Sequence, residues 1–77
     1  MNDSRRKVLG RAKGLLREAA ALVDLVCDQE EDSLDNMPEN LQGSDRYAKI
    51  ERAVDNLREA MEHIEDAQAC IAEATVK

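Results

Sequence analysis

The amino-acid sequence predicts an all-α fold, an antiparallel helical hairpin of two long helices. The composition is poor in helix-breaking residues, with three Gly and one Pro among 77 residues, and it contains neither Phe nor Trp. Apolar residues recur at alternating spacings of three and four residues in two separate stretches, which is the heptad pattern of paired helices. A single turn-forming segment separates the two stretches. The chain is therefore expected to form one domain, residues 1–77, that reverses its direction once.

The first helix is expected over about residues 4–33. Its heptad seam alternates large aliphatic residues with Ala and consists of Leu9, Ala12, Leu16, Ala19, Val23 and Val26. Because the separation of two packed helices depends on the side chains at their contact, the small Ala residues favour a close antiparallel pairing.

The connection is expected to be an ordered loop over residues 34–43, which contain the only Pro of the chain. Pro38 suits the first position of a short helical turn. Gly43 suits a left-handed exit from that turn, and Ser44 suits the N-cap of the next helix. The second helix is expected over about residues 45–75. Its seam continues over four heptads as Ile50, Ala53, Leu57, Ala60, Ile64, Ala67, Ile71 and Ala74.

Further apolar residues lie beside each predicted seam. Val8, Leu15 and Leu22 follow one side of the first seam, while Val54 and Met61 follow one side of the second. One neighbouring helix cannot cover both a seam and its extra column, and a two-helix hairpin of this length is marginal against its chain entropy. These five residues are therefore predicted to form an oligomer interface, in a four-helix bundle or a larger assembly. The alternative is a monomer with a broad apolar stripe.

The charge of the chain restricts the classes of function. Acidic residues outnumber basic ones by 17 to 11, giving a formal net charge of -6, and there is one Tyr. This balance argues against direct nucleic-acid binding, which uses basic residues and stacking aromatic residues. No apolar run is long enough to span a membrane, and the basic start is interrupted at Gly10 before any signal-peptide core. We expect a cytoplasmic protein without membrane association.

The charges are segregated along the chain, and each pole is a candidate binding site. Residues 5–17 hold six of the eleven bases, whereas residues 28–45 hold seven acids and no base. The acidic pole is predicted to bind basic residues of a protein partner, and its candidate residues are Asp28, Glu31, Asp32, Asp35 and Glu39. The alternative interpretation is a solvated face without a partner.

The basic pole supports a second hypothesis, a nucleotide ligand held in pockets between subunits. Its candidate residues are Arg5, Arg11, Arg17, Arg46 and Tyr47, which combine cationic side chains with the only aromatic ring. Gly10 and Gly14 interrupt the first helix among these bases. They either expose backbone to an anion or a partner helix, or are merely tolerated near a helix end.

The sequence does not predict an enzyme, a metal site or a cofactor. Its single His cannot form a Cys-His or Ser-His-Asp arrangement. The carboxylates around His63 lack the Glu-x-x-His spacing of di-iron bundles, because position 60 is Ala. Cys27 and Cys70 are expected to lie far apart along the hairpin, as free and buried thiols in a reducing compartment.

The segment around the connection resembles a known family. Asn36-x-Pro38-Glu39-Asn40-Leu41-Gln42-x-Ser44-x-Arg46, followed by Ala53-Val54-Asp55-Asn56-Leu57-x-Glu59-Ala60, is similar to small helical-hairpin proteins of Gram-positive bacteria and their phages. The resemblance covers nearly the whole chain. That family is uncharacterised, so the resemblance implies a helical hairpin and a phage or mobile-element setting.

A shorter likeness involves Ser44-Asp45-Arg46 and Leu57-Arg58-Glu59-Ala60-Met61, which look like the closing helix of phage sponges that sequester cyclic-nucleotide immune signals. Three functions follow as hypotheses. The first is a non-enzymatic oligomeric binding protein, phage-derived, that inhibits a host defence protein through its acidic surface. The second is a nucleotide sponge, and the third is a purely structural assembly module.

Overall fold

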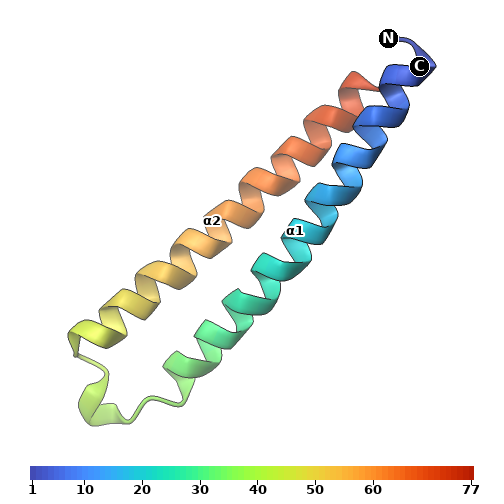
Figure 1. The fold of residues 1–77 in the computed structure, drawn as a ribbon. Coiled ribbons are helices and arrows are strands. Elements are labelled where there is room, and N and C mark those ends of the chain that lie inside the picture. The colour runs from blue at the N-terminus through green and yellow to red at the C-terminus, as the bar shows by residue number, and fades with distance from the viewer.

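The computed structural model describes all 77 residues and contains two antiparallel helices joined by a short connection (Figure 1). Helix α1 spans Asp3–Asp35, a short 3-10 helix η1 spans Glu39–Leu41, and helix α2 spans Asp45–Ala74. The Cα atoms extend over 59 × 15 × 13 Å, so the molecule is a thin rod. The prediction of an all-α helical hairpin is confirmed.

Polar contacts define both ends of the rod. Asn2 caps α1, its side chain accepting a hydrogen bond from the Arg5 backbone N–H at 2.8 Å. Ser44 caps α2 as predicted, accepting from the Tyr47 backbone N–H at 3.2 Å. Such caps satisfy N–H groups that the first turn of a helix leaves unpaired. The two chain ends meet where Arg6 Nε donates to the Thr75 carbonyl oxygen at 3.2 Å.

The connection has a different geometry from the predicted one at Gly43. No residue of the chain has a positive φ angle, so the expected left-handed exit at Gly43 is wrong. The chain instead leaves α1 through Asn36, whose backbone N–H still bonds to α1 carbonyls, and becomes extended at Pro38, with φ -57° and ψ 147°. The backbone is extended again at Ser44, with φ -78° and ψ 161°, so the connection contains extended residues on both sides of η1 and no left-handed residue.

The face of α1 that packs on α2 is rotated from the predicted seam. Cys27 is only 3% exposed, whereas the predicted seam residue Val26 is 43% exposed. Leu9, Leu16 and Val23 are half-buried as the prediction requires. The covered face thus runs towards Cys27 rather than towards Val26, which leaves a second apolar column of α1 in solvent.

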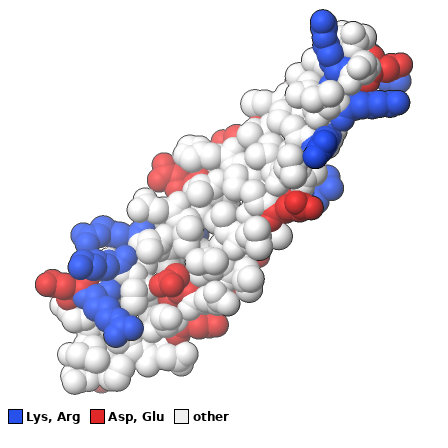
Figure 2. All heavy atoms as spheres, viewed as in Figure 1, with Lys and Arg blue, Asp and Glu red and all other residues white.

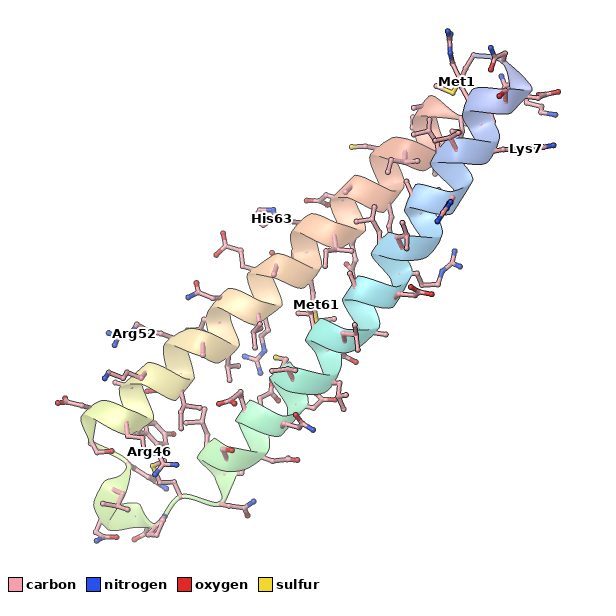
Figure 3. The ribbon with its side chains drawn as sticks, viewed as in Figure 1. Met1, Lys7, Arg46, Arg52, Met61 and His63 are labelled. Atoms are coloured by element: carbon pink, nitrogen blue, oxygen red, sulfur yellow. The ribbon has the colours of Figure 1, made fainter.

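The apolar residues beside the α2 seam are covered within the hairpin. Val54 is only 2% exposed, and Met61 is half-buried and lies between the two helices (Figure 3). The expectation that Val54 and Met61 remain for a second chain is therefore corrected: both already pack within the hairpin. Only Cys27 and Val54 are fully buried among the 77 residues, so a single hairpin has almost no enclosed core.

Gly10 and Gly14 are expected to weaken α1 without any packing benefit. A Cβ atom built at either glycine meets no other atom within 4 Å. Replacing each Gly by Ala should therefore raise the free energy of unfolding by about 1 kcal/mol, which corresponds to a rise in Tm of about 4–8 °C in thermal unfolding. The reverse change Ala21→Gly, at an exposed position of α1, should lower Tm by a similar amount. Unchanged Tm values for the Ala variants would contradict this account of the glycines.

Candidate functional site

The predicted acidic surface lies where α1 ends and η1 begins. Asp28, Asp32 and Asp35 are exposed on α1, and Glu39 is exposed at the start of η1. The three Asp residues follow spacings of four and three, so they occupy one stripe of the helix. We call Asp28, Asp32, Asp35 and Glu39 the acidic surface. No ion pair within the chain neutralises its carboxylates.

Glu31, the fifth predicted residue of this surface, has a structural role. Its side chain is half-buried and forms an ion pair with Arg58 of α2. This hydrogen bond with Glu31, together with the negative charge of Glu31, raises the pKa of Arg58 and keeps its guanidinium charged. Glu31 therefore connects the two helices and is less accessible to a second protein than its neighbours.

A small cavity of about 200 Å³ opens between the helices beside this ion pair. It has four carboxylates, one guanidinium and two aliphatic side chains in its wall, from Glu31, Leu34, Asp35, Glu51, Val54, Asp55 and Arg58. The excess of carboxylates makes the cavity suitable for a cationic side chain of another protein. The acidic character predicted from α1 is thus extended by Glu51 and Asp55 of α2, which lie outside the acidic segment of the sequence.

Basic residues of α2 border the acidic surface. Figure 2 shows basic side chains gathered at the start of α2 as well as at the start of α1, with acidic residues between them. Arg46 and Arg52 belong to this group (Figure 3), and Lys49 lies between them in sequence. This group does not appear in the acidic segment 28–45, because that segment ends immediately before Arg46. The loop end is therefore acidic on α1 and mixed in charge on α2.

Burial and Glu31 control the reactivity of Cys27. The Cys27 Sγ donates a hydrogen bond to Glu31 Oε1 at 3.6 Å. Burial first, and then the negative charge of Glu31, raises the pKa of the Cys27 thiol. Both cysteines are free as predicted, but Cys70 is exposed, so its predicted burial is wrong.

We expect Cys27 to react with iodoacetamide at least tenfold more slowly than Cys70 at pH 8, because the thiolate is the nucleophile and Cys27 is buried and kept protonated. Mass spectrometry of quenched samples measures both rates in one chain. The raised pKa favours the thiol form of Cys27 in the folded state. The contribution of Cys27 to the free energy of unfolding is therefore fully present below pH ~8.5 and decreases at higher pH. Equal alkylation rates for the two cysteines in the folded protein would contradict the burial of Cys27.

The candidate residues for a nucleotide ligand are not brought together within one chain. Arg5, Arg11 and Arg17 lie along the first half of α1, whereas Arg46 and Tyr47 lie at the start of α2, towards the opposite end of the rod (Figure 1). A shallow depression beside Arg11 and Arg17 also contains Glu18. The ligand-binding hypothesis therefore requires a second chain to complete any pocket.

The predicted interface residues on α1 are open to solvent. Val8 is 68%, Leu15 56% and Leu22 64% exposed. No large apolar residue of α2 is similarly exposed. Of the two long helices, only α1 therefore carries exposed large apolar residues.

The structure offers no arrangement for metal chemistry and no membrane-spanning helix. No three His, Cys, Asp or Glu side chains are grouped closely enough to hold a metal ion. His63 is on the outer side of α2 (Figure 3), with its Nε2 3.5 Å from Glu59 Oε1. Neither helix is long and apolar enough to cross a membrane.

Comparison with known proteins gives no relative for this chain: no family model, no curated protein and no solved structure matches it. The charge and exposure of the hairpin's residues are therefore the structural evidence that bears on its function.

Proposed function

We propose that this chain is a non-enzymatic, self-associating helical protein that binds a basic surface of another protein through its acidic surface. The observation that carries this proposal is the exposed stripe of Asp28, Asp32 and Asp35, which has no ion-pair partner within the chain. Unpaired surface carboxylates attract basic proteins over long range and increase association rates. The cavity beside Arg58 adds a place for one cationic side chain.

The setting of this function follows from the family resemblance. The segment from Asn36 to Arg46 resembles hairpin proteins of Gram-positive bacteria and their phages, so we expect a phage-derived protein that acts in the host cytoplasm. Its target in this proposal is a host protein, such as a defence factor, with a basic surface. The protein acts by occupying that surface rather than by catalysis.

A charge-reversal experiment tests the acidic surface. The triple variant Asp28→Lys, Asp32→Lys and Asp35→Lys should capture at least tenfold less basic protein than the wild type from a lysate of Gram-positive bacteria. Quantitative mass spectrometry measures the captured amounts. The loss is expected because the attraction is replaced by repulsion.

The control changes the net charge by the same amount on the other half of the molecule. Glu62→Lys, Glu65→Lys and Asp66→Lys alter exposed residues of α2 and should leave the captured set of proteins unchanged. Equal loss in both variants would show that net charge alone determines capture, and unchanged capture by both would exclude the acidic surface. Calorimetric titration with cyclic di- and trinucleotides tests the sponge alternative. Binding heat that is present in the wild type and absent in the Arg46→Ala variant would favour that function instead.

A further inference from the structure

The outer face of α1 carries a complete second heptad seam. Its residues recur at spacings of four and three without interruption and are Val8, Ala12, Leu15, Ala19, Leu22 and Val26. The four large residues of this set are exposed, and the two Ala residues are half-buried. Residues at these spacings are neighbours on a helix surface, so they form one continuous apolar strip. We call these six residues the outer seam.

The outer seam and the face of α1 that contacts α2 point in nearly perpendicular directions around the α1 axis. A second helix can therefore pack along α1 on the outer seam. Each residue of the covered face follows a residue of the outer seam by one position, as Leu9 follows Val8 and Cys27 follows Val26. One residue corresponds to a rotation of about 100° around an α-helix. A helix with two such faces has the geometry of a member of a four-helix bundle, which packs against two neighbours.

The surface area of the chain supports a covering partner. The accessible surface is 5888 Å² for 8.6 kDa, whereas a compact monomer of this mass exposes about 4,700 Å². The excess of about 1,200 Å² exceeds the roughly 800 Å² that each subunit covers in a stable protein interface. A partner seated along α1 would remove an area of this order.

The charges of α1 indicate what that partner is. Residues 5–17 contain six bases and no acid, whereas residues 18–35 contain seven acids and no base. Among these thirteen charged side chains, only Arg6 and Glu31 form ion pairs within the chain. The α1 helix is therefore complementary to itself when two copies run in opposite directions. Parallel copies would set bases against bases and acids against acids.

We propose that two copies of this chain pair through their outer seams, with the two α1 helices antiparallel and a two-fold axis near the middle of α1, at residues 17–21. With the axis at Arg17, Ala12 packs against the partner's Leu22 and Ala19 against the partner's Leu15. Each small residue then receives a large one, as in knobs-into-holes packing. The two α2 helices flank this central pair in a four-helix assembly.

This inference rests on the self-association in the proposed function, and its charge argument shares Asp28, Asp32 and Asp35 with the acidic surface. The antiparallel arrangement places the two connections at opposite ends of the dimer. With this axis, Asp35 and the connection extend past the first residue of the second copy and stay available. The dimer is thus bivalent and can bind two basic sites with increased avidity.

Sedimentation equilibrium of the full chain tests the pairing. The wild type should show a mass of about 17 kDa, twice the 8.6 kDa of one chain. Leu15→Glu with Leu22→Glu should give 8.6 kDa with unchanged helicity, because both residues are exposed in the hairpin. The control Leu41→Glu with Val76→Glu makes the same chemical change at exposed residues outside α1 and should remain dimeric. If the seam variant loses helicity, Leu15→Gln with Leu22→Gln provides the same test without added charge.

The salt dependence of the same measurement tests the antiparallel order. Raising NaCl from 50 to 500 mM screens surface charges and should weaken the wild-type dimer several-fold, since opposite charges face each other. A parallel dimer would become tighter, because its like charges would be screened. A wild-type mass of one chain at every concentration, a dimeric Leu15→Glu/Leu22→Glu variant, or a dimer that tightens with salt would each overturn the proposal. Unchanged target capture by the variant Asp28→Lys, Asp32→Lys and Asp35→Lys would instead count against the acidic surface alone.

Discussion

Replacing Val54 with Asp is expected to unfold the hairpin, with a loss of about 3 kcal/mol or more from the free energy of unfolding. Val54 is one of the two fully buried residues and shares a cavity wall with Glu31, Glu51 and Asp55. The new carboxylate would be removed from water and placed among like charges. The measurement is urea unfolding followed by circular dichroism at 222 nm.

The matched control for Val54→Asp is Val76→Asp. Val76 is the same residue type but lies in solvent beyond the end of α2, so its replacement should change the free energy of unfolding by less than about 0.5 kcal/mol. Similar stability of the Val54→Asp variant and the wild type would mean that Val54 is not enclosed by the two helices.

Leu57→Ala is expected to reduce the free energy of unfolding by about 2 kcal/mol. Leu57 is a half-buried seam residue in α2, and its removal leaves a gap along the contact with α1. The same truncation at Leu41, an exposed residue of η1, should cost much less. Urea unfolding compares the two variants. An equal cost at both positions would indicate that the hairpin contact contributes little to stability.

The helices and their direction could be predicted from the sequence because several local signals agree. The heptad spacing, the single Pro and the Ser44 cap all place the same boundaries, and the structure has them within two residues. The rotation of α1 could not be predicted in this way. Val26 and Cys27 are both apolar and adjacent, so spacings of three and four fit either face, and the choice depends on the shape of α2.

The candidate site shows a similar division. The acids of α1 could be identified because they lie within eight residues of one another, at spacings that place them on one helical stripe. The ion pair between Glu31 and Arg58 joins residues 27 positions apart, and the pairing depends on how the two helices are aligned along the rod. The heptad pattern repeats every seven residues and fits several such alignments. Glu31 was therefore predicted as a binding residue although it connects the helices.

In the proposed dimer, two copies cover each other's outer seams with their α1 helices antiparallel. Pulsed electron paramagnetic resonance on Asp35→Cys, spin-labelled in a Cys27→Ala/Cys70→Ser background, measures the distance between the two copies of this exposed position at the end of α1. With the two-fold axis at residues 17–21, a rise of 1.5 Å per residue predicts about 40–55 Å between the labels. A distance near the interhelical spacing of about 10 Å would indicate parallel helices, and the absence of any distance between chains would indicate a monomer; either result would contradict the account.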